Sequence, residues 1–330
     1  IYTEQENLNN DLVKIKVIGV GGAGNNAVNR MIDEGIQNVQ FIAINTEEQA
    51  LTQSKADTQL HIGKNTTKGL GAGSNPLLGE MAAREDEENI KKLLLGADMV
   101  FVTAGMGGGT GTGSAPVVCE LAKNVGILTV GIVTKPFVFE GKRRRENAEN
   151  GIARMKKNVD ALIVVENSNL IKTVSKGTTM VDAFREADGV LKKGVQGITD
   201  LITIPGFINI DFADVKTIMK DSGVAHMGIG IASGDQRAIE AAEKAIDSPL
   251  LSTSINGAKG LIVNVTGGID LGLSEVSTAV GLIKEYLDSE ANIIFGTIVD
   301  ESIQHDAIMV TVIATGIDEE ENQKIIKYNI

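Results

Sequence analysis

The sequence is poor in cysteine, proline and aromatic residues. Its 330 residues include one cysteine, 5 prolines, 8 phenylalanines, 3 tyrosines and no tryptophan. The lone Cys119 excludes an internal disulfide and agrees with a reducing compartment. No apolar run approaches the ~18 residues of a membrane-spanning helix, and the polar first dozen residues are unlike a signal or transit peptide. The sequence therefore predicts a soluble, cytosolic protein without direct membrane insertion.

Positive charge is also in deficit, whereas glycine is abundant. The 43 acidic residues outnumber the 31 lysines and arginines, which argues against a nucleic-acid partner. The histidines, His61, His226 and His305, lack ligand-like spacing, so we expect no metal site built from side chains. Glycine reaches 38 residues without a repeat or proline enrichment, which predicts tight turns and close backbone approaches.

The length and the rhythm of the first half predict an α/β domain in a two-domain chain. Nearly continuous β-branched runs alternate with helical patterns, as in a parallel sheet that helices cover on both faces. The expected strands are 13–20, 39–45, 98–104, 127–134 and 161–167, and the expected helices are 27–34, 76–95, 114–124 and 146–158.

A change of rhythm marks the second half. Residues 179–203 predict one long helix, with apolar side chains every three or four positions and Pro205–Gly206 after it. Beyond it we expect helices at 212–220, 236–246 and 273–287, and strands at 226–232, 260–266, 293–299 and 308–314. A short polar turn between the last two strands favours some antiparallel pairing.

The predicted architecture is a doubly wound, mostly parallel nucleotide-binding sheet, a long central helix and a smaller α+β domain. The expected boundaries are 12–178, 179–203 and 204–316, with flexible ends at 1–11 and 317–330.

Two glycine-rich loops lie where a parallel sheet presents ligands, after strands and before helices. Residues 19–26 satisfy G-x-G-x-x-G, and with Glu47 after the next strand they form a weak dinucleotide signature. Residues 105–113 hold six glycines, which let a phosphate reach backbone N–H groups. The helix expected to open at Ser114 and Pro116 directs its positive end at that anion. Two phosphate loops suit a triphosphate better than NAD. A third cluster, 68–73, fits a phosphate-side loop and a plain connection equally well.

Several segments resemble the FtsZ family of cell-division GTPases in the tubulin/FtsZ superfamily. G-G-G-T-G-T-G at 107–113 matches the superfamily signature, and N-I-D-F-A-D-V-K-T-I-M at 209–219 resembles the family's synergy loop. Further similar segments, 15–32, 133–144 and 183–188, follow in the family's order, so the resemblance covers about residues 12–316. It implies a tubulin/FtsZ-like fold and a GTP/GDP site.

The resemblance assigns the two glycine loops to the phosphates. The implied contacts are Gly21, Gly22, Ala23, Asn25 and Asn26 in the first loop, and Gly105, Met106, Gly108, Gly109, Thr110 and Gly111 in the second. Thr110 would donate its hydroxyl hydrogen at the β/γ end. Mg²⁺ is expected between the phosphate oxygens.

The resemblance assigns the sugar and base contacts to later segments of the chain. The implied contacts are Thr134, Pro136, Glu140, Arg144, Asn167, Phe184 and Asp188. Thr134 and Pro136 would flank the sugar, while Glu140 would take a ribose hydroxyl. Phe184 would stack on the base, and Asp188 would accept from the guanine N1–H and amine, which adenine lacks.

The implied catalytic residues are Asp211 and Asp214, with Asn209, in the synergy-loop segment. Between Asp188 and this loop, helix up to residue 203 spans roughly 22 Å at ~1.5 Å per residue. One chain would therefore not close its own site. Head-to-tail stacking, which the FtsZ family performs, would deliver the loop to a neighbour's nucleotide.

The implied partner is a second copy of the chain, in a filament that forms the cytoplasmic division ring at mid-cell. Family members usually reach tethers and regulators through a C-terminal peptide, which this sequence does not contain. Two alternatives remain: an NAD-dependent oxidoreductase using the first loop and Glu47, and a filament protein that binds nucleotide without hydrolysing it. Ala23, Glu166 and Ser168 depart from the family pattern.

Overall fold

The computed structural model describes residues 13–173, 177–204, 206–247, 253–300, 303 and 306–318. The expected flexible end 1–11 lies outside the described residues, as do Pro205, His305 and residues 319–330. Ile317, expected in the second flexible end, is buried against the smaller domain. Within the described ranges, no helix has both the length and the apolar character to cross a membrane.

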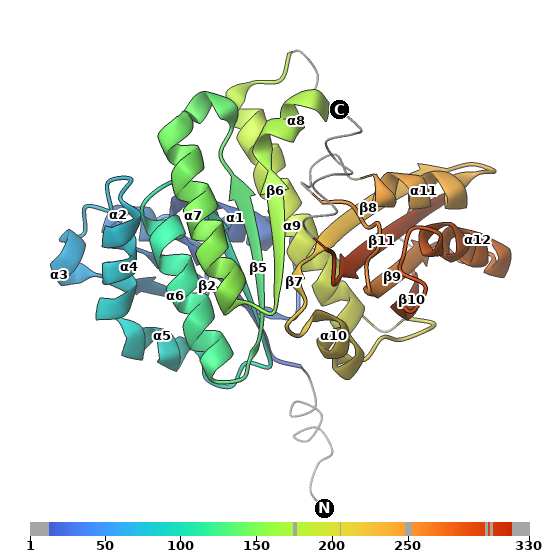
Figure 1. Ribbon diagram of the computed structural model, residues 1–330, viewed down its shortest axis with the longest axis horizontal. Helices are drawn as coiled ribbons and strands as arrows, with labels where there is room; N and C mark the ends of the chain where they lie inside the picture. Colours follow the sequence, from blue (N-terminus) through green and yellow to red (C-terminus); the bar gives the residue numbers. More distant parts are fainter. Residues whose placement is uncertain are drawn as a thin grey trace, which may run out of the picture.

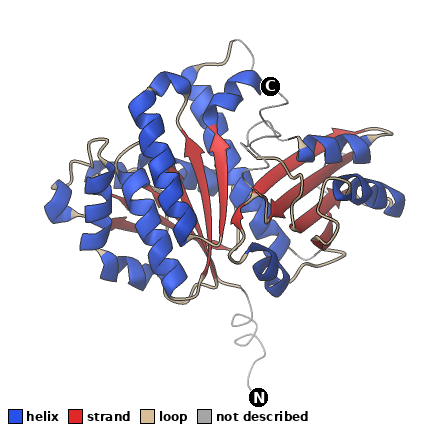
Figure 2. Cartoon of the chain, viewed as in Figure 1, coloured by secondary structure: helices blue, strands red, loops and turns tan. Residues whose placement is uncertain are grey.

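The larger sheet contains seven parallel strands in the described part of the chain, in the order β3-β2-β1-β4-β5-β6-β7 (Figures 1 and 2). The strands are β1 (Ile15–Val20), β2 (Val39–Asn45), β3 (Thr58–His61), β4 (Met99–Gly105), β5 (Leu128–Lys135), β6 (Ala161–Glu166) and β7 (Gly223–Val224). The predicted doubly wound α/β class is confirmed. The sequence prediction omitted β3 and β7, which are too short to show a pattern.

Helices cover both faces of this sheet. They are α1 (Gly21–Asp33), α2 (Glu48–Leu51), α3 (Lys64–Thr67), α4 (Pro76–Glu85), α5 (Glu87–Leu94), α6 (Thr110–Asn124), the 3₁₀ helix η1 (Val138–Glu140), α7 (Lys142–Asn158), α8 (Asn167–Thr173) and α9 (Met180–Thr203). Alternate strand residues supply two cores. Ile15 and Val17 pack with α1 and α9, whereas Ile18 and Val20 pack on the other face with α4–α7. Burial on both faces explains the continuous apolar runs.

Helix α6 begins at Thr110, four residues before the predicted start, and therefore includes two glycines of the second loop. A Cβ atom on Gly113 would lie 2.0 Å from the Pro76 carbonyl oxygen, because α4 packs directly against α6. Gly113 therefore serves close helix packing, whereas Gly111 lies against the strand ends, where a Cβ atom would be 2.8 Å from the Gly105 carbonyl oxygen. The sequence pattern did not separate these packing roles from loop flexibility. Ser114 is consequently inside the helix, where its hydroxyl donates to the Gly79 carbonyl at 2.7 Å.

The helix predicted at 76–95 is two helices, α4 and α5, which meet at Asp86. The Asp86 backbone leaves helical geometry (ψ 22°), and its carboxylate accepts from the Gly63 amide at 2.7 Å. An aspartate that bonds a backbone amide elsewhere competes with helix continuation, and the hydrophobic pattern carries no trace of this contact.

The smaller sheet has the strand order β10-β9-β11-β8, flanked by α11 and α12. Its elements are α10 (Phe212–Met219), β8 (His226–Ser233), α11 (Arg237–Ile246), β9 (Gly260–Gly267), α12 (Leu273–Lys284), β10 (Asn292–Val299) and β11 (Ala307–Thr315). Strand β11 pairs antiparallel with β8 and β9, while β10 pairs parallel with β9. The expected antiparallel pairing is present, but β9 separates the last two strands.

Helix α9 lies between the two sheets (Figure 1). Gly194 faces Ile132 of β5, and Gly197 faces Met227 of β8, so small residues let the helix approach both sheets. Its apolar residues Leu191, Val195 and Ile198 belong to one core with residues of both sheets. The central helix therefore joins the two halves through continuous apolar packing.

Asp160, just before β6, connects the larger sheet to the turn between α10 and β7. Its buried carboxylate accepts from the Thr129 amide at 2.8 Å and the Asp221 amide at 3.3 Å, and Lys123 Nζ lies 3.6 Å from it. The Asp160 carbonyl also accepts from the Gly223 amide at 3.0 Å. One buried residue thus holds the edge at which α10 returns to the sheet.

We predict that Asp160→Ala lowers the free energy of unfolding by about 2–4 kcal/mol, because buried amides lose their acceptor. The measurement is urea unfolding followed by circular dichroism. Asp235→Ala, which removes an exposed carboxylate before α11, is the control and should change stability by about 0.5 kcal/mol or less. Equal losses in the two variants would contradict the connecting role.

Candidate functional site

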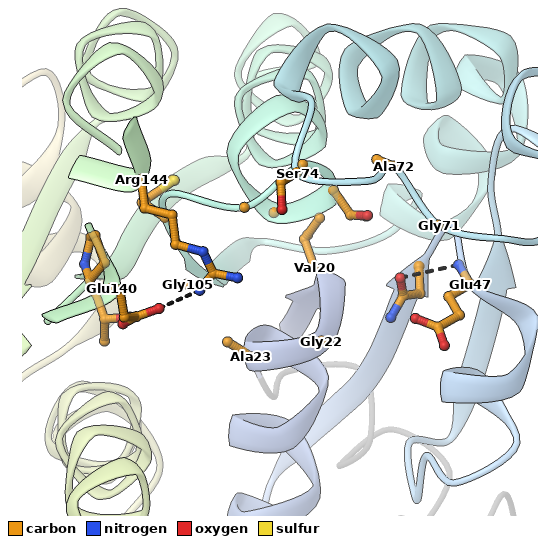
Figure 3. A pocket seen from close by; sticks show the side chains of 18 of the residues that line it. Val20, Gly22, Ala23, Glu47, Gly71, Ala72, Ser74, Gly105, Glu140 and Arg144 are labelled. Carbon is orange, nitrogen blue, oxygen red and sulfur yellow. Dashed lines mark hydrogen bonds and ion pairs between the residues drawn. The ribbon is translucent and has the colours of Figure 1, made fainter. Parts of the chain in front are cut away.

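A cavity of about 490 Å³ opens at the carboxyl ends of the central parallel strands (Figure 3). Residues from both glycine loops, the 70–74 segment, the region after β5 and helix α9 line it. They are Val20, Gly22, Ala23, Asn45, Glu47, Leu70, Gly71, Ala72, Gly73, Ser74, Gly105, Met106, Gly108, Gly109, Thr110, Gly111, Thr134, Pro136, Glu140, Arg144, Asn167, Phe184, Ala187 and Asp188. The structure therefore brings most of the sequence-predicted binding residues together.

The first glycine loop forms the start of α1. Gly22 and Ala23 line the cavity, whereas Gly21 lies behind it against α6, where a Cβ atom would be 2.8 Å from the Gly111 nitrogen. The buried Asn25 side chain donates to the Gly19 carbonyl at 2.8 Å and accepts from Asn45 Nδ2 at 2.8 Å. Asn26 is exposed and is not among the lining residues. The Asn25 amide thus fixes the loop rather than facing the cavity.

The second glycine loop leads into the N-terminus of α6. Gly109 is the N-cap and supplies no side-chain acceptor, so the first-turn amides remain available to an anion. Gly108 faces open space, with nothing within 4 Å of a built Cβ atom. A Cβ atom on Gly109 would instead lie 2.7 Å from Ala72 Cβ. The two adjacent glycines therefore differ in surroundings, because Gly108 borders open space in the cavity whereas Gly109 packs against Ala72.

Glu140 and Arg144 stand together on one side of the cavity, opposite Glu47 and Gly71 (Figure 3). The Glu140 carboxylate accepts from the Phe137 amide at 3.0 Å and forms an ion pair with Arg144. Thr134 is buried at the end of β5. The carboxylate of Glu140, the guanidinium of Arg144 and the hydroxyl of Thr134 thus belong to residues that line the cavity. Thr134 and Glu140 are among the residues for which sugar contacts were predicted.

Asn167, Phe184 and Asp188 form the end of the cavity nearest α9. Asn167 is 5% exposed, and its Oδ1 has no hydrogen-bond partner among the described residues. The Phe184 ring is 41% exposed and meets Phe137 edge-on, with ring centroids 5.2 Å apart. Burial raises the pKa of Asp188 to about 6, against the lowering effect of Arg30. This end offers two side chains with oxygen acceptors beside a partly exposed aromatic residue.

The departures from the family pattern at residues 166 and 168 stay outside the cavity lining. Glu166 is buried beside Lys135 and Arg145, at 3.8 and 3.6 Å. Ser168 Oγ accepts from the Val138 amide at 3.1 Å. Both side chains thus bind to neighbouring segments of the chain, whereas Asn167, which lies between them, lines the cavity.

The predicted catalytic residues lie elsewhere. Asp211 is the N-cap of α10, and its Oδ1 accepts from the Asp214 amide at 2.8 Å. Asn209 Oδ1 accepts from the Gly206 amide at 2.6 Å. All three side chains are exposed, and none lines the cavity. Helix α8, which begins at Asn167, lies near the top of the view in Figure 1, whereas α10 lies near the bottom.

Sequence reasoning did not assign several lining residues, among them Val20, Asn45, Ala187 and the 70–74 segment. The third glycine cluster was the available signal for that segment, and the structure places Leu70–Ser74 at the cavity. Glu47 was considered only for a dinucleotide, although it lies in the same wall.

Cys119 and His226 are not among the residues that line the cavity. Cys119 is buried in α6, which raises the pKa of its thiol. His226 is buried in β8, where desolvation lowers its pKa to about 4, and its Nδ1 lies 2.8 Å from the Thr253 carbonyl oxygen. In the described ranges, no three His, Cys, Asp or Glu side chains group to hold a metal ion.

Two family descriptions match the chain. "Tubulin/FtsZ family, GTPase domain" matches residues 14–175, and "FtsZ family, C-terminal domain" matches residues 223–318. Among solved structures, the chain is similar to the empty FtsZ dimer of M. jannaschii, with 46% identity, a TM-score of 0.88, and 95% of this chain and 91% of that chain covered. CetZ2 from Haloferax volcanii, in a GTPγS-bound protofilament, is 21% identical with a TM-score of 0.80, covering 96% of each chain. At that identity CetZ2 supports the fold alone.

We predict that Gly108→Ala weakens binding of a nucleoside triphosphate by about tenfold or more, because its methyl group enters the open cavity while folding is unaffected. Isothermal titration with GTP and a thermal melt measure the two effects. Gly109→Ala is the comparison, and its clash with Ala72 should lower the melting temperature. Unchanged affinity in folded Gly108→Ala would place the phosphates elsewhere.

Proposed function

The chain belongs to the FtsZ family, and from this premise we propose that it binds and hydrolyses GTP in a head-to-tail filament. Each subunit's cavity would hold the nucleotide, and the next subunit's Asp211 and Asp214 would complete the catalytic site. The filament would form the division ring in the cytoplasm at mid-cell and recruit tethers and regulators there.

The pair of acceptors at the base end carries the choice of guanine. Asn167 Oδ1 is buried with no hydrogen-bond partner among the described residues, and the Asp188 carboxylate also lines the cavity. Guanine presents the N1–H and the exocyclic amine on one edge, so two acceptors match two donors. Adenine presents an acceptor at its N1 and would leave a buried oxygen unpaired, at a cost of about 1–3 kcal/mol. Phe184, which is partly exposed and lines the cavity, would supply stacking area for the base.

The phosphate end supports a triphosphate. The start of α6 offers uncapped amides and the positive end of a 15-residue helix. We propose that Mg²⁺ is held chiefly by phosphate oxygens, with Glu47 as the nearby carboxylate in the cavity wall. When bound, the ion neutralises charge on the phosphates. Arg144, next to Glu140, is the cation positioned to approach the same charge.

Distance supports a shared catalytic site. Helix α9 runs 15 residues from Asp188 to its end at Thr203, about 22 Å at ~1.5 Å per residue, and so separates Phe184 and Asp188 from the Asp211 loop. Apolar side chains are exposed in both regions. Leu70 (84% exposed) lies at the cavity, and Phe207 (85% exposed) lies just before Asn209. Apolar surface at both ends fits a heterologous contact that repeats along a filament. In it, Asp211 or Asp214 would orient the attacking water.

Phosphate release against protein concentration tests hydrolysis, with sedimentation in parallel. We expect the rate per subunit to rise where filaments form. Filaments without phosphate release would favour the alternative of a nucleotide-binding structural protein.

We predict that guanosine affinity falls by about tenfold between pH 7.5 and pH 5, because a carboxyl with a pKa of about 6 becomes protonated and loses its role as acceptor. Guanosine binds the ionised carboxylate of Asp188, so its affinity is highest at pH values above the pKa and declines as the pH falls below the pKa. Guanosine is the probe because it carries no phosphate to titrate. Equilibrium dialysis measures the affinity.

Asp188→Asn provides the control, because an amide does not titrate in this range. It should bind guanosine weakly, with little dependence on pH. A wild-type affinity that is constant from pH 7.5 to 5 would remove Asp188 from the base site.

We predict that Asp211→Asn binds GTP normally but loses about 10²–10⁴-fold in turnover, as expected for a lost acid–base group. Asparagine is as good an N-cap as aspartate, so α10 keeps its first turn. Mixed with Asp188→Asn, which has an intact loop but a defective cavity, Asp211→Asn should regain activity at mixed interfaces.

Steady-state phosphate release from the mixture, with co-sedimentation to confirm joint assembly, gives the result. Co-assembled mixtures whose rate equals the sum of the separate rates would exclude a shared site.

A further inference from the structure

Two threonine hydroxyls meet where β2 ends and α6 begins. Thr46 follows β2 and is fully buried, whereas Thr110 is the first residue of α6 and lines the cavity. Their Oγ1 atoms are 2.6 Å apart, which is a short hydrogen bond for two hydroxyls. Thr46 does not itself line the cavity.

The surroundings of Thr46 determine which hydroxyl donates. The Thr46 amide donates to Asn45 Oδ1 at 2.9 Å, and its carbonyl accepts from Thr67 Oγ1 and the Gly71 amide, at 3.2 and 3.3 Å. In the part of the chain that the structure describes, Thr110 Oγ1 is the hydrogen-bond partner of the Thr46 hydroxyl.

A hydroxyl has one proton and two lone pairs. If Thr110 donated, the Thr46 proton would be buried without an acceptor, which is costly. Thr110 is half-buried at the cavity, where its own proton reaches water or a ligand. The bond therefore runs from Thr46 to Thr110.

We propose that Thr46 is a positioning residue, whose buried hydroxyl holds the Thr110 oxygen as acceptor and so directs the Thr110 proton towards the phosphates of bound GTP. The proposal rests on the function proposed above. A hydroxyl that already accepts a hydrogen bond is a stronger donor, and a donor oriented in advance loses less freedom on binding. The Thr46 carbonyl also accepts from Gly71 in the cavity wall, so one residue connects that wall to α6.

The test compares Thr46→Val, which keeps the shape and removes the hydroxyl, with Thr46→Ser, which keeps the hydroxyl. Titration calorimetry with GTP should show about tenfold weaker binding for Thr46→Val and recovery in Thr46→Ser. Guanosine affinity should be equal in all three proteins, because guanosine has no phosphate for Thr110 to contact. A general loss of structure would lower both affinities together.

The second arm asks whether Thr46 acts through Thr110. In a Thr110→Val background, adding Thr46→Val should not weaken GTP binding further. It should also raise the melting temperature above that of Thr110→Val alone, because the buried donor left without an acceptor is removed. Thr46→Ala is the second variant without a hydroxyl, should Thr46→Val fail to fold.

Wild-type GTP affinity in Thr46→Val, an equal loss for guanosine, or a further loss in the Thr110→Val background would each overturn the proposal. Failure of the proposed function is separate, because the wild-type protein would then bind neither GTP nor guanosine.

Discussion

The close approach of helix N-termini to neighbouring backbones is the constraint on which the cavity depends. A Cβ atom on Gly21 would lie 2.8 Å from the Gly111 nitrogen, and one on Gly79 would lie 2.4 Å from the Gly109 carbonyl oxygen. The start of α6 therefore meets both the first turn of α1 and helix α4 without intervening side chains. Only this packing leaves backbone amides, rather than methyl groups, at the carboxyl edge of the sheet. Substitutions there divide into those that fill the cavity and those that separate the helices.

Helix α9 imposes the second constraint, because it separates the proposed base-binding residues from the proposed catalytic residues. Its first turns carry Phe184 and Asp188, and the segment after its last turn carries Asn209 and Asp211. Gly194 and Gly197 bring the helix against both sheets, so bending it would disturb the core that the two halves share. The separation is thus built into the packing. A site that needs both ends is satisfied more simply by a second subunit than by movement within one.

The sequence predicted what repeats along the chain and missed what depends on single contacts. The alternation of apolar runs and helical patterns was enough for the α/β sheet and for α9. Residues of both glycine loops line the cavity, and their contact with phosphates stays a prediction. The break at Asp86 depends on one amide of Gly63, and the early start of α6 depends on its contact with α4. Periodicity does not encode either contact. The hydrogen bond from the Asn25 side-chain amide to the Gly19 carbonyl, and the one between the Thr46 and Thr110 hydroxyls, are likewise visible only in the folded structure.

Helix α6 joins these constraints into one framework. It begins at Thr110 in the cavity, and Lys123 in its last turn donates to the Val159 carbonyl and to the Asp221 carboxylate, at 3.0 and 2.7 Å. Asp221 follows α10 and is also held by Asp160, so α6 reaches from the cavity to the turn after the helix that Asp211 caps. The exposed Lys123–Asp221 pair contributes little energy by itself, whereas the buried Asp160 fixes the geometry. Two helices, α6 and α9, therefore set the spacing between the cavity and the Asp211 loop within one chain. The proposed head-to-tail contact requires such a fixed spacing, because identical subunits would have to meet repeatedly with the same interface.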